Sequence, residues 1–501
     1  MHLGIDFGTT RTVVAVADRG NYPVVDFLDL DHDYHSHFPT VSALVDGKLV
    51  HGFAAQTAAR SGARLIRSVK RHLADPDLTL ESVIDVDGQQ IALLHLVTSF
   101  FTALREALQQ SSTLPEGEPI GAVVVGVPAH AHTAQRLLTL EAFRRAGFEV
   151  GAMLNEPSAA GFEYTHRQHR TVTSRRNCVL VYDLGGGTFD ASLVSVENAD
   201  HEVLGSVGIN RLGGDDFDLL LADLVLEKAG VREQDLPERA LDELVEQCRE
   251  AKEGLTPQTR RLGVEVGDQM VALDVADFYR ASTPLVEQSL QVMEPLVAGL
   301  DAAASDLAGL YLVGGSSGLP LVPRVLRERF GRRVRRSPYP GASTAIGLAI
   351  AADPEAGYTL TEQLSRGFGV FREGDAGREV RFDAILAPDH RVSVTDEVVV
   401  TRRYRAAHNI GWFRFVEYGR LDDAGQPVGD LSPRGELIFP FDPELRRGQD
   451  LLQAPVVRLE QGHLVEEVYT VDPHGIITVR VTDLDDGFSV TAQPRAATAA
   501  S

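Results

Sequence analysis

The sequence predicts an α/β protein, made of a duplicated domain with two lobes and a smaller all-β domain after it. Two stretches predict the duplication because they share one order of residues: an apolar strand, an aspartate, glycine, threonine and a second apolar strand. They are Leu3–Val14 (LGIDFGTTRTVV) and Val179–Asp190 (VLVYDLGGGTFD). Downstream of each, a strand, a proline, an amphipathic helix and a glycine recur in that order, at Ala122–Gly147 and Leu310–Gly331. After residue 367, short runs of β-branched and aromatic residues between turn residues predict the all-β domain.

The glycine-rich stretch Val179–Asp190 has the composition of a phosphate-binding loop. Its apolar run predicts a buried strand. Gly185, Gly186 and Gly187 lack a Cβ atom, so their backbone N–H groups can point at an anion. Asp183 at the strand end can hold a hydrated Mg²⁺ ion. Alone, the stretch is also explained by a plain glycine turn. The similar stretch near the N-terminus instead favours a duplicated fold in which both loops bind one polyphosphate from opposite sides.

Composition and charge exclude several classes of protein. The chain has 501 residues, enough for more than one domain, and 44% of them are hydrophobic. Its net charge of −23 argues against a broad basic surface for nucleic acid and favours a soluble protein. Cys178 and Cys248 are too few for a disulfide framework, which favours a reducing compartment, and both fit the role of small buried hydrophobic residues. The sequence enters its first strand without a signal segment, and no run approaches the roughly 20 apolar residues that cross a bilayer. We therefore expect a cytoplasmic protein that contacts no membrane.

Several segments together resemble a known superfamily, the actin-like ATPases, whose fold is a duplicated, ribonuclease H-like domain with two lobes. They are the loops around Asp6 and Asp183, the segment Gly314–Gly318 and the triplet Ala345–Gly347. A narrower resemblance is to the seventy-kilodalton heat-shock chaperone family. It is carried by Asp183–Asp190, Asn155–Ala160 (NEPSAA) and Leu212–Asp218 (LGGDDFD). Sugar kinases and actin share the phosphate loops with this chain but lack the last two segments.

The resemblance implies how the chain is divided. The expected parts are an actin-like nucleotide-binding domain at 1–352 with halves at about 1–170 and 177–352, a linker at 353–366, a β-sandwich resembling a substrate-binding domain at 367–492, and a disordered tail at 493–501. The linker has fewer aliphatic residues than is usual in the family, so we expect its docking to couple the domains weakly. No segment resembling the family's helical lid follows the β-sandwich. We therefore expect a divergent, lidless member with fast substrate exchange.

The resemblance also implies which residues bind the nucleotide and its metal ion. Metal-binding roles fall on Asp6, Asp183, Glu156 and Asp190, and catalytic roles on Lys70, Glu156, Thr188 and Asp183. Nucleotide-binding roles fall on Gly8, Thr9, Thr10, Arg11, Gly185, Gly186, Gly187, Thr188, Gly213, Gly214, Asp215, Lys252, Thr256, Gly314, Gly315 and Ser316. Lys70 is expected to approach the γ-phosphate and to help position the attacking water, a role that suits the compact charge of a lysine.

Three of these residues keep a plainer alternative. Lys70 lies in the basic run 64–71, a pattern typical of a solvated face. Glu156 precedes Pro157, so it is also explained as an acid that the dipole at a helix start favours. The negative charge favoured at the helix start near Asp215 is either a phosphate or the side chain of Asp215 itself.

Four positions depart from the chaperone family's pattern. Arg11 stands where the family commonly has Asn, and it either adds charge near the phosphates or points to solvent. Arg249 and Glu253 stand where the family has Glu and Arg. Glu253 cannot stack on adenine, a contact of about 0.5–2 kcal/mol, so we expect weaker nucleotide binding unless the two charges compensate each other on one helix face. Ala152 replaces an arginine that helps engage J-domain co-chaperones.

The resemblance implies an ATP-dependent, chaperone-like ATPase that uses ATP or ADP with Mg²⁺, takes K⁺ as a further candidate cation, and binds unfolded or extended polypeptide. Pro128 and Arg136 resemble the family's relay between nucleotide and linker, although Pro128 is also explained as a strand end. A J-domain co-chaperone, against which Ala152 argues, and a nucleotide-exchange factor are the implied protein partners. The alternative hypothesis is a nucleotide-dependent scaffold or regulatory module with low turnover, whose β domain binds one folded partner. A small-molecule kinase is disfavoured because no separate domain for a sugar acceptor is evident.

Overall fold

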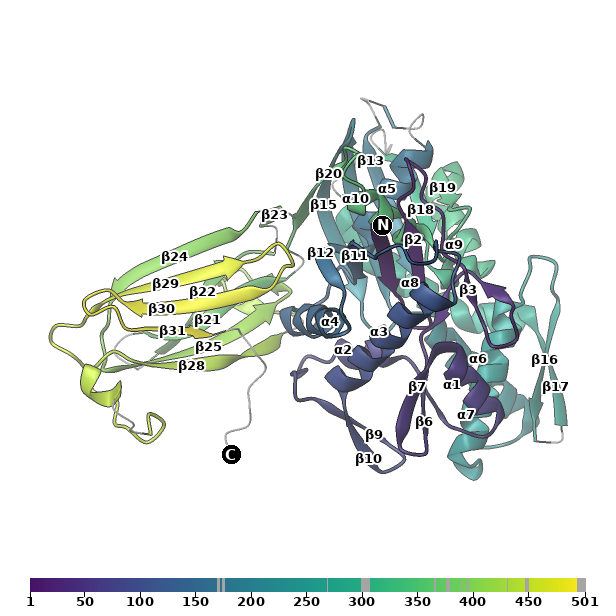
Figure 1. Ribbon diagram of the computed structural model, residues 1–501, viewed down its shortest axis with the longest axis horizontal. Coiled ribbons are helices and arrows are strands. Elements are labelled where there is room, and N and C mark those ends of the chain that lie inside the picture. Colours follow the sequence, from purple (N-terminus) through teal and green to yellow (C-terminus); the bar gives the residue numbers. More distant parts are fainter. Residues whose placement is uncertain are drawn as a thin grey trace.

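The computed structural model shows an α/β part and, beside it, a part made of β-strands (Figure 1). It describes residues 1–168, 172–173, 176–267, 269–298, 307–364, 366–374, 379–388, 390–393, 396–429, 431–446 and 450–492. The tail predicted at 493–501 lies outside these residues. Within them, none of the helices has the length and apolar character needed to span a membrane.

The first lobe is built on a five-stranded sheet with the order β12-β11-β1-β2-β5. β1 pairs antiparallel with β2 and parallel with β11, and β11 pairs parallel with β12. Asp6 stands near the end of β1, so its carboxylate lies beside the turn into β2. The strands are β1 (Leu3–Phe7), β2 (Arg11–Val16), β5 (Phe38–Pro39), β11 (Ala122–Val127) and β12 (Glu149–Asn155).

The second lobe repeats this arrangement in a seven-stranded sheet with the order β19-β18-β13-β14-β15-β20-β23. β13 pairs antiparallel with β14 and parallel with β18, which pairs parallel with β19. Every residue of β13 and β18 is buried, which explains why both strands are almost entirely apolar. The repeated order confirms the predicted α/β architecture with two lobes. The strands are β13 (Cys178–Leu184), β14 (Phe189–Glu197), β15 (Asp200–Ile209), β18 (Leu307–Val313), β19 (Val334–Arg336), β20 (Thr359–Gln363) and β23 (Arg391–Ser393).

Helices cover both sheets (Figure 1). They are α1 (Gly52–Arg60), α2 (Val69–Leu73), α3 (Leu93–Gln110), α4 (Thr133–Arg145), α5 (Glu156–Gln168), α6 (Gly214–Ala229), α7 (Glu238–Glu253), α8 (Val275–Ala298), α9 (Leu321–Phe330) and α10 (Ser343–Ala352). The remaining strands of this part form small sheets: β3 (Phe27–Leu28) with β4 (Tyr34–His35), β6 (Ser42–Val45) with β7 (Lys48–His51) and β8 (Leu65–Ile66), β9 (Val83–Val86) with β10 (Gln89–Ala92), and β16 (Arg261–Val266) with β17 (Gln269–Asp274).

The two lobes are joined where α5 and α10 pack against each other. A Cβ atom on Gly347 of α10 would lie 1.8 Å from the carbonyl oxygen of Ala159 on α5. A Cβ atom on Gly4 of β1 would lie 2.2 Å from the backbone nitrogen of Ala349 on α10. Both approaches are possible only because these residues have no side chain. The glycine of the triplet Ala345–Gly347 is therefore needed for the close packing of α10 on α5, which joins the two lobes.

The segment predicted as a linker contains β20, which is the last strand but one of the second sheet. β20 pairs parallel with β15 and antiparallel with β23. Leu360 of β20 is buried, and Tyr358 packs against the rings of Phe162 and His201. Backbone hydrogen bonds therefore hold β20 in place although the segment has few aliphatic residues, and the weak coupling expected between the domains stays a prediction. β23 lies inside the range predicted for the β-sandwich but belongs to the α/β sheet.

The β-rich part contains two four-stranded antiparallel sheets that share one hydrophobic core. Aromatic residues of both sheets meet in this core, as Phe368 and Tyr469 do. A bidentate ion pair, 2.6 Å long, joins Arg372 of the first sheet to the fully buried Glu467 of the second. The first sheet contains β22 (Glu379–Leu386), β21 (Gly367–Gly374), β25 (Ile410–Tyr418) and β28 (Ser432–Pro440), and the second β24 (Val398–Arg405), β29 (Leu464–Val471), β30 (Ile477–Asp483) and β31 (Ser489–Ala492), with β26 (Arg420–Leu421) and β27 (Pro427–Val428) forming a separate hairpin.

Replacing Gly347 with alanine is expected to lower the free energy of unfolding by about 1–3 kcal/mol or more, because the added methyl group forces α5 and α10 apart. Urea unfolding measures this change. Gly341→Ala is the matched control, since a Cβ atom there meets no other atom within 4 Å. Equal losses of stability in the two variants would contradict the packing explanation.

Candidate functional site

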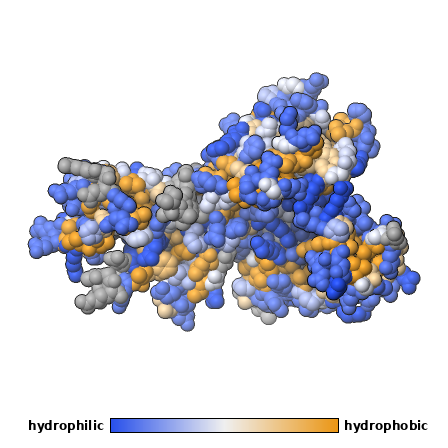
Figure 2. All heavy atoms as spheres, turned by 90° about the horizontal axis from the view of Figure 1, so that it is seen from below, coloured by the Kyte–Doolittle hydropathy of each residue, from blue (hydrophilic) through white to orange (hydrophobic). Residues whose placement is uncertain are grey.

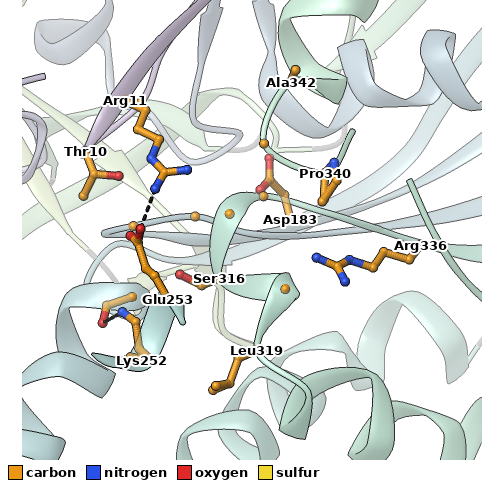
Figure 3. Close-up of a pocket in the computed structure, with 18 of the residues that line it drawn as sticks. Thr10, Arg11, Asp183, Lys252, Glu253, Ser316, Leu319, Arg336, Pro340 and Ala342 are labelled. Atoms are coloured by element: carbon orange, nitrogen blue, oxygen red, sulfur yellow. Dashed lines mark hydrogen bonds and ion pairs between the residues drawn. The ribbon is translucent and has the colours of Figure 1, made fainter. Parts of the chain in front are cut away.

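A cavity of about 1510 Å³ lies between the two lobes, and residues of both lobes line it. Figure 2 shows mainly hydrophilic atoms where the two masses of the α/β part meet. Figure 3 shows side chains from opposite lobes directed into this space, Arg11 from one lobe and Glu253 from the other. The predicted residues that line the cavity are Asp6, Gly8, Thr9, Thr10, Arg11, Lys70, Glu156, Asp183, Gly185, Gly186, Thr188, Gly214, Asp215, Lys252, Thr256, Gly314, Gly315 and Ser316.

The two glycine-containing hairpins face each other at the cavity. A Cβ atom on Gly186 would lie 2.9 Å from Thr10 Cγ2, and one on Gly187 would lie 2.7 Å from Thr9 Oγ1. The threonine side chains of the first hairpin therefore pack directly on the backbone of the second. Only glycine allows this approach, which leaves backbone N–H groups and hydroxyls of both hairpins around one space.

Four carboxylates, those of Asp6, Glu156, Asp183 and Asp190, lie around Lys70 near the two facing hairpins. Lys70 forms a buried ion pair with Glu156. Burial, and next the charge of Glu156, raise the pKa values of Asp6 and Asp183 well above their usual range. The same two causes raise the pKa of Asp190 to about 7. Carboxylates outnumber the ammonium group, and their oxygens are the ligands that Mg²⁺ prefers, so the residues fit a divalent cation.

An unusual backbone conformation precedes Lys70, which lines the cavity. Ser68, which precedes α2, has φ 52° and ψ 33°, the left-handed region that a serine adopts at a cost of about 1–2 kcal/mol. Its hydroxyl donates a hydrogen bond of 2.6 Å to Asp215 Oδ2 of the other lobe. Lys70 is thus a buried residue with a defined partner, and its surroundings are not those of a solvated basic face.

Three predicted residues do not line the cavity. Asp190 Oδ1 accepts a hydrogen bond of 3.1 Å from the backbone of Ala129, which directs this carboxylate toward the first lobe. Gly187 and Gly213 pack against each other, since a Cβ atom on Gly213 would lie 2.6 Å from the nitrogen of Gly187. Gly187 and Gly213 let their two loops approach closely. A glycine in the sequence can serve such loop packing or contact with a ligand, and the pattern alone does not distinguish the two.

The first amides of α6 hold the triple-glycine loop. Gly214 N donates to Gly185 O over 3.0 Å, and Asp215 N donates to Gly186 O over 2.8 Å. These two N–H groups are therefore occupied within the protein. They are not available to a phosphate, and the helix start instead fixes the loop that faces the cavity.

The altered charges on α7 have different partners from those expected. Arg249 pairs within its own lobe, at 3.2 Å from Asp218 and 3.1 Å from Glu246. Glu253 instead pairs with Arg11 of the other lobe, at 2.5 Å, as the dashed line in Figure 3 marks. The alternative left open by the sequence, that Arg249 and Glu253 compensate each other on one helix face, is not what the structure shows, because each pairs with other residues.

The cavity also has lining residues that the sequence did not indicate. Arg336, at the end of β19, points into the cavity in Figure 3, and its Nη2 atom would lie 2.8 Å from a Cβ atom on Gly318. Tyr339 also lines the cavity. The signal available in the sequence was the basic run 332–336, which follows the glycine stop of α9.

A chain of hydrogen bonds leads from the cavity to the β-rich part. Asn155 precedes Glu156, and its backbone nitrogen donates to Glu362 of β20 over 3.0 Å. Its side-chain oxygen accepts a hydrogen bond of 2.5 Å from Arg136, which also donates to the carbonyl oxygen of His474 over 3.3 Å. Arg136 thus contacts both the first lobe and the β-rich part.

A second buried contact joins the two parts at Glu417. This carboxylate accepts hydrogen bonds from Arg434 Nε over 2.7 Å and from the backbone nitrogen of Thr133, on α4, over 3.0 Å. Burial alone would raise the pKa of Glu417, but the positive charges around it, chiefly Arg434, lower it to about 2. Glu417 therefore stays ionised while the parts are docked.

Comparisons with known proteins show what the chain is similar to. The family model described as "Hsp70 protein" matches residues 2–364. A curated relative, "Chaperone protein HscA homolog" from Tolumonas auensis, is 33% identical over 363 residues, which cover 70% of this chain and 57% of the relative. The chain thus spans a little over half the length of that relative in the match.

The Glu417→Gln variant is expected to be less stable than the natural chain by about 3 kcal/mol at neutral pH, because Arg434 loses its buried counter-charge. The difference should be constant above pH 5 and should shrink as the pH falls from 4.5 toward 2, since the folded-state pKa of Glu417 lies below its unfolded value of 4.5. Urea unfolding, followed by the fluorescence of Trp412, the chain's single tryptophan, measures it.

Glu460→Gln, at an exposed position of the β-rich part, is the matched control and should change stability little at any pH. A stability difference for Glu417→Gln that did not depend on pH would contradict the role given to this carboxylate.

Proposed function

The chain belongs to the Hsp70 protein family, and from that premise we propose that it binds ATP with Mg²⁺ between its lobes and hydrolyses it. We further propose that hydrolysis is coupled to the binding of unfolded or extended polypeptide by the β-rich part, acting as a β-sandwich. The observation that carries this proposal is the pair of facing hairpins with a cluster of carboxylates and one buried lysine behind them.

The proposed chemistry consists of positioning and charge stabilisation. In this proposal Asp6 and Asp183 would hold Mg²⁺, and the ion would supply positive charge to the phosphate oxygens. Thr10 and Thr188, one from each hairpin, present hydroxyl groups to the phosphate end. Lys70 and Glu156 form an acid–base pair that orients the attacking water.

The proposed coupling runs through the contacts between the parts. A change of position at Asn155 is transmitted to Glu362 of the linker strand and to Arg136, which holds the turn at His474. A nucleotide-exchange factor is a proposed partner, and a J-domain co-chaperone is a weaker one because of Ala152. The chain's two cysteines, Cys178 and Cys248, are both buried thiols, which fits the proposed cytoplasmic location.

Lys70→Ala is expected to lower ATP turnover by about a hundredfold, because it removes a preorganised positive charge from the phosphate end. Release of phosphate under single-turnover conditions measures this loss, and ATP binding should persist. Lys228→Ala, at an exposed position of α6, is the matched control. Normal turnover in Lys70→Ala would show that the lysine has no catalytic role.

Extended hydrophobic peptides are expected to stimulate ATP turnover, and Arg136→Met should lower the ratio of stimulated to basal turnover toward one. The reason is the loss of the bridge from Asn155 to His474. Arg145→Met, on the exposed face of the same helix, is the control and should keep the ratio. A natural chain that hydrolyses ATP without any response to peptide would favour the scaffold hypothesis.

A further inference from the structure

One ion pair connects the lobes inside the cavity itself. Arg11 Nη2 lies 2.5 Å from Glu253 Oε2, and Arg11 directly follows Thr9 and Thr10 of the first hairpin. Glu253 ends α7, next to Lys252 (Figure 3). Both members of the pair are departures from the family pattern, and the fold brings these two departures into contact across 242 residues of sequence.

Other ion pairs also cross between the lobes, but their positions differ. Arg64 pairs with Glu238 and Arg71 with Asp216. None of these four residues lines the cavity, whereas Arg11 and Glu253 both do. In the described part of the chain, Arg11 and Glu253 have no ion-pair partner other than each other.

The exposure of the pair decides what it can contribute. Each side chain is 45% exposed, so water and salt screen the attraction. An exposed pair of this kind changes an equilibrium constant by less than about fivefold, which makes it a minor brace for the lobes. A guanidinium that bonds to phosphate oxygens contributes more, about tenfold or above, because such charge-assisted bonds are short and often bidentate.

We propose that Glu253 limits the affinity for nucleotide by holding the Arg11 guanidinium away from the phosphate groups. The carboxylate of Glu253 and the phosphates compete for the same guanidinium, which lies one residue beyond Thr10. This inference rests on the proposed function, since it requires nucleotide phosphates at the facing hairpins. It predicts that removing a negative charge from α7 strengthens binding, and that the gain grows with the number of phosphates.

Isothermal titration of the full chain with ATP, ADP and AMP in the presence of Mg²⁺ tests the inference. Glu253→Gln should bind ATP about tenfold more tightly, with a smaller gain for ADP and the smallest for AMP. Arg11→Gln should bind ATP more weakly than the natural chain. In the Arg11→Gln background, adding Glu253→Gln should tighten ATP binding by less than about threefold, because the guanidinium is no longer there to be released.

Glu250→Gln removes the same charge from an exposed position of α7 outside the cavity lining, so it controls for net charge and should leave the affinity unchanged. The inference is overturned if Glu253→Gln binds ATP no more tightly, as a simple brace between the lobes would require. It is also overturned if the gain is equal with and without Arg11. A natural chain that binds no nucleotide overturns the proposed function, and the inference falls with it.

Discussion

The two halves of the chain depend on one contact, in which threonine side chains of the first hairpin rest on the bare backbone of the second. Thr9 and Thr10 come so close to Gly186 and Gly187 that a single Cβ atom on either glycine would clash. The packing of α10 on α5 through Gly347 is another close contact that only glycine allows. Glycine is required at both places. The same close contacts therefore hold the two lobes together and shape the cavity between them.

A second requirement concerns the charges buried between the α/β part and the β-rich part. Glu417, Arg434, Glu362 and Arg136 are all buried, and each has a partner on another element. A buried charge that loses its partner is costly, so these contacts form and break together. Such a junction favours discrete docked and undocked arrangements, which is the property that coupling between a nucleotide and a distant binding domain requires.

The sequence was sufficient to predict the fold and the site where a pattern of residues has one structural explanation. An apolar strand followed by an acid and glycine predicted both hairpins, and these line the cavity together. It was insufficient where the same residue type serves two purposes: Gly187 and Gly213 pack loop on loop, although the pattern placed them at the ligand. The pairing of the linker strand was not predicted because its hydrogen bonds come from the backbone, which leaves no trace in residue type. The contact between Arg11 and Glu253 depends on how the two lobes meet, and no local pattern contains that information.

The most direct test of the account is a crystal structure of the chain with Mg²⁺ and a non-hydrolysable ATP analogue. The account predicts the phosphate groups between Thr9–Thr10 and Gly185–Thr188, with the metal ion facing Asp6 and Asp183. Electron density for the analogue at another site, with the space between the two hairpins free of ligand, would contradict the central claim that both hairpins bind one polyphosphate.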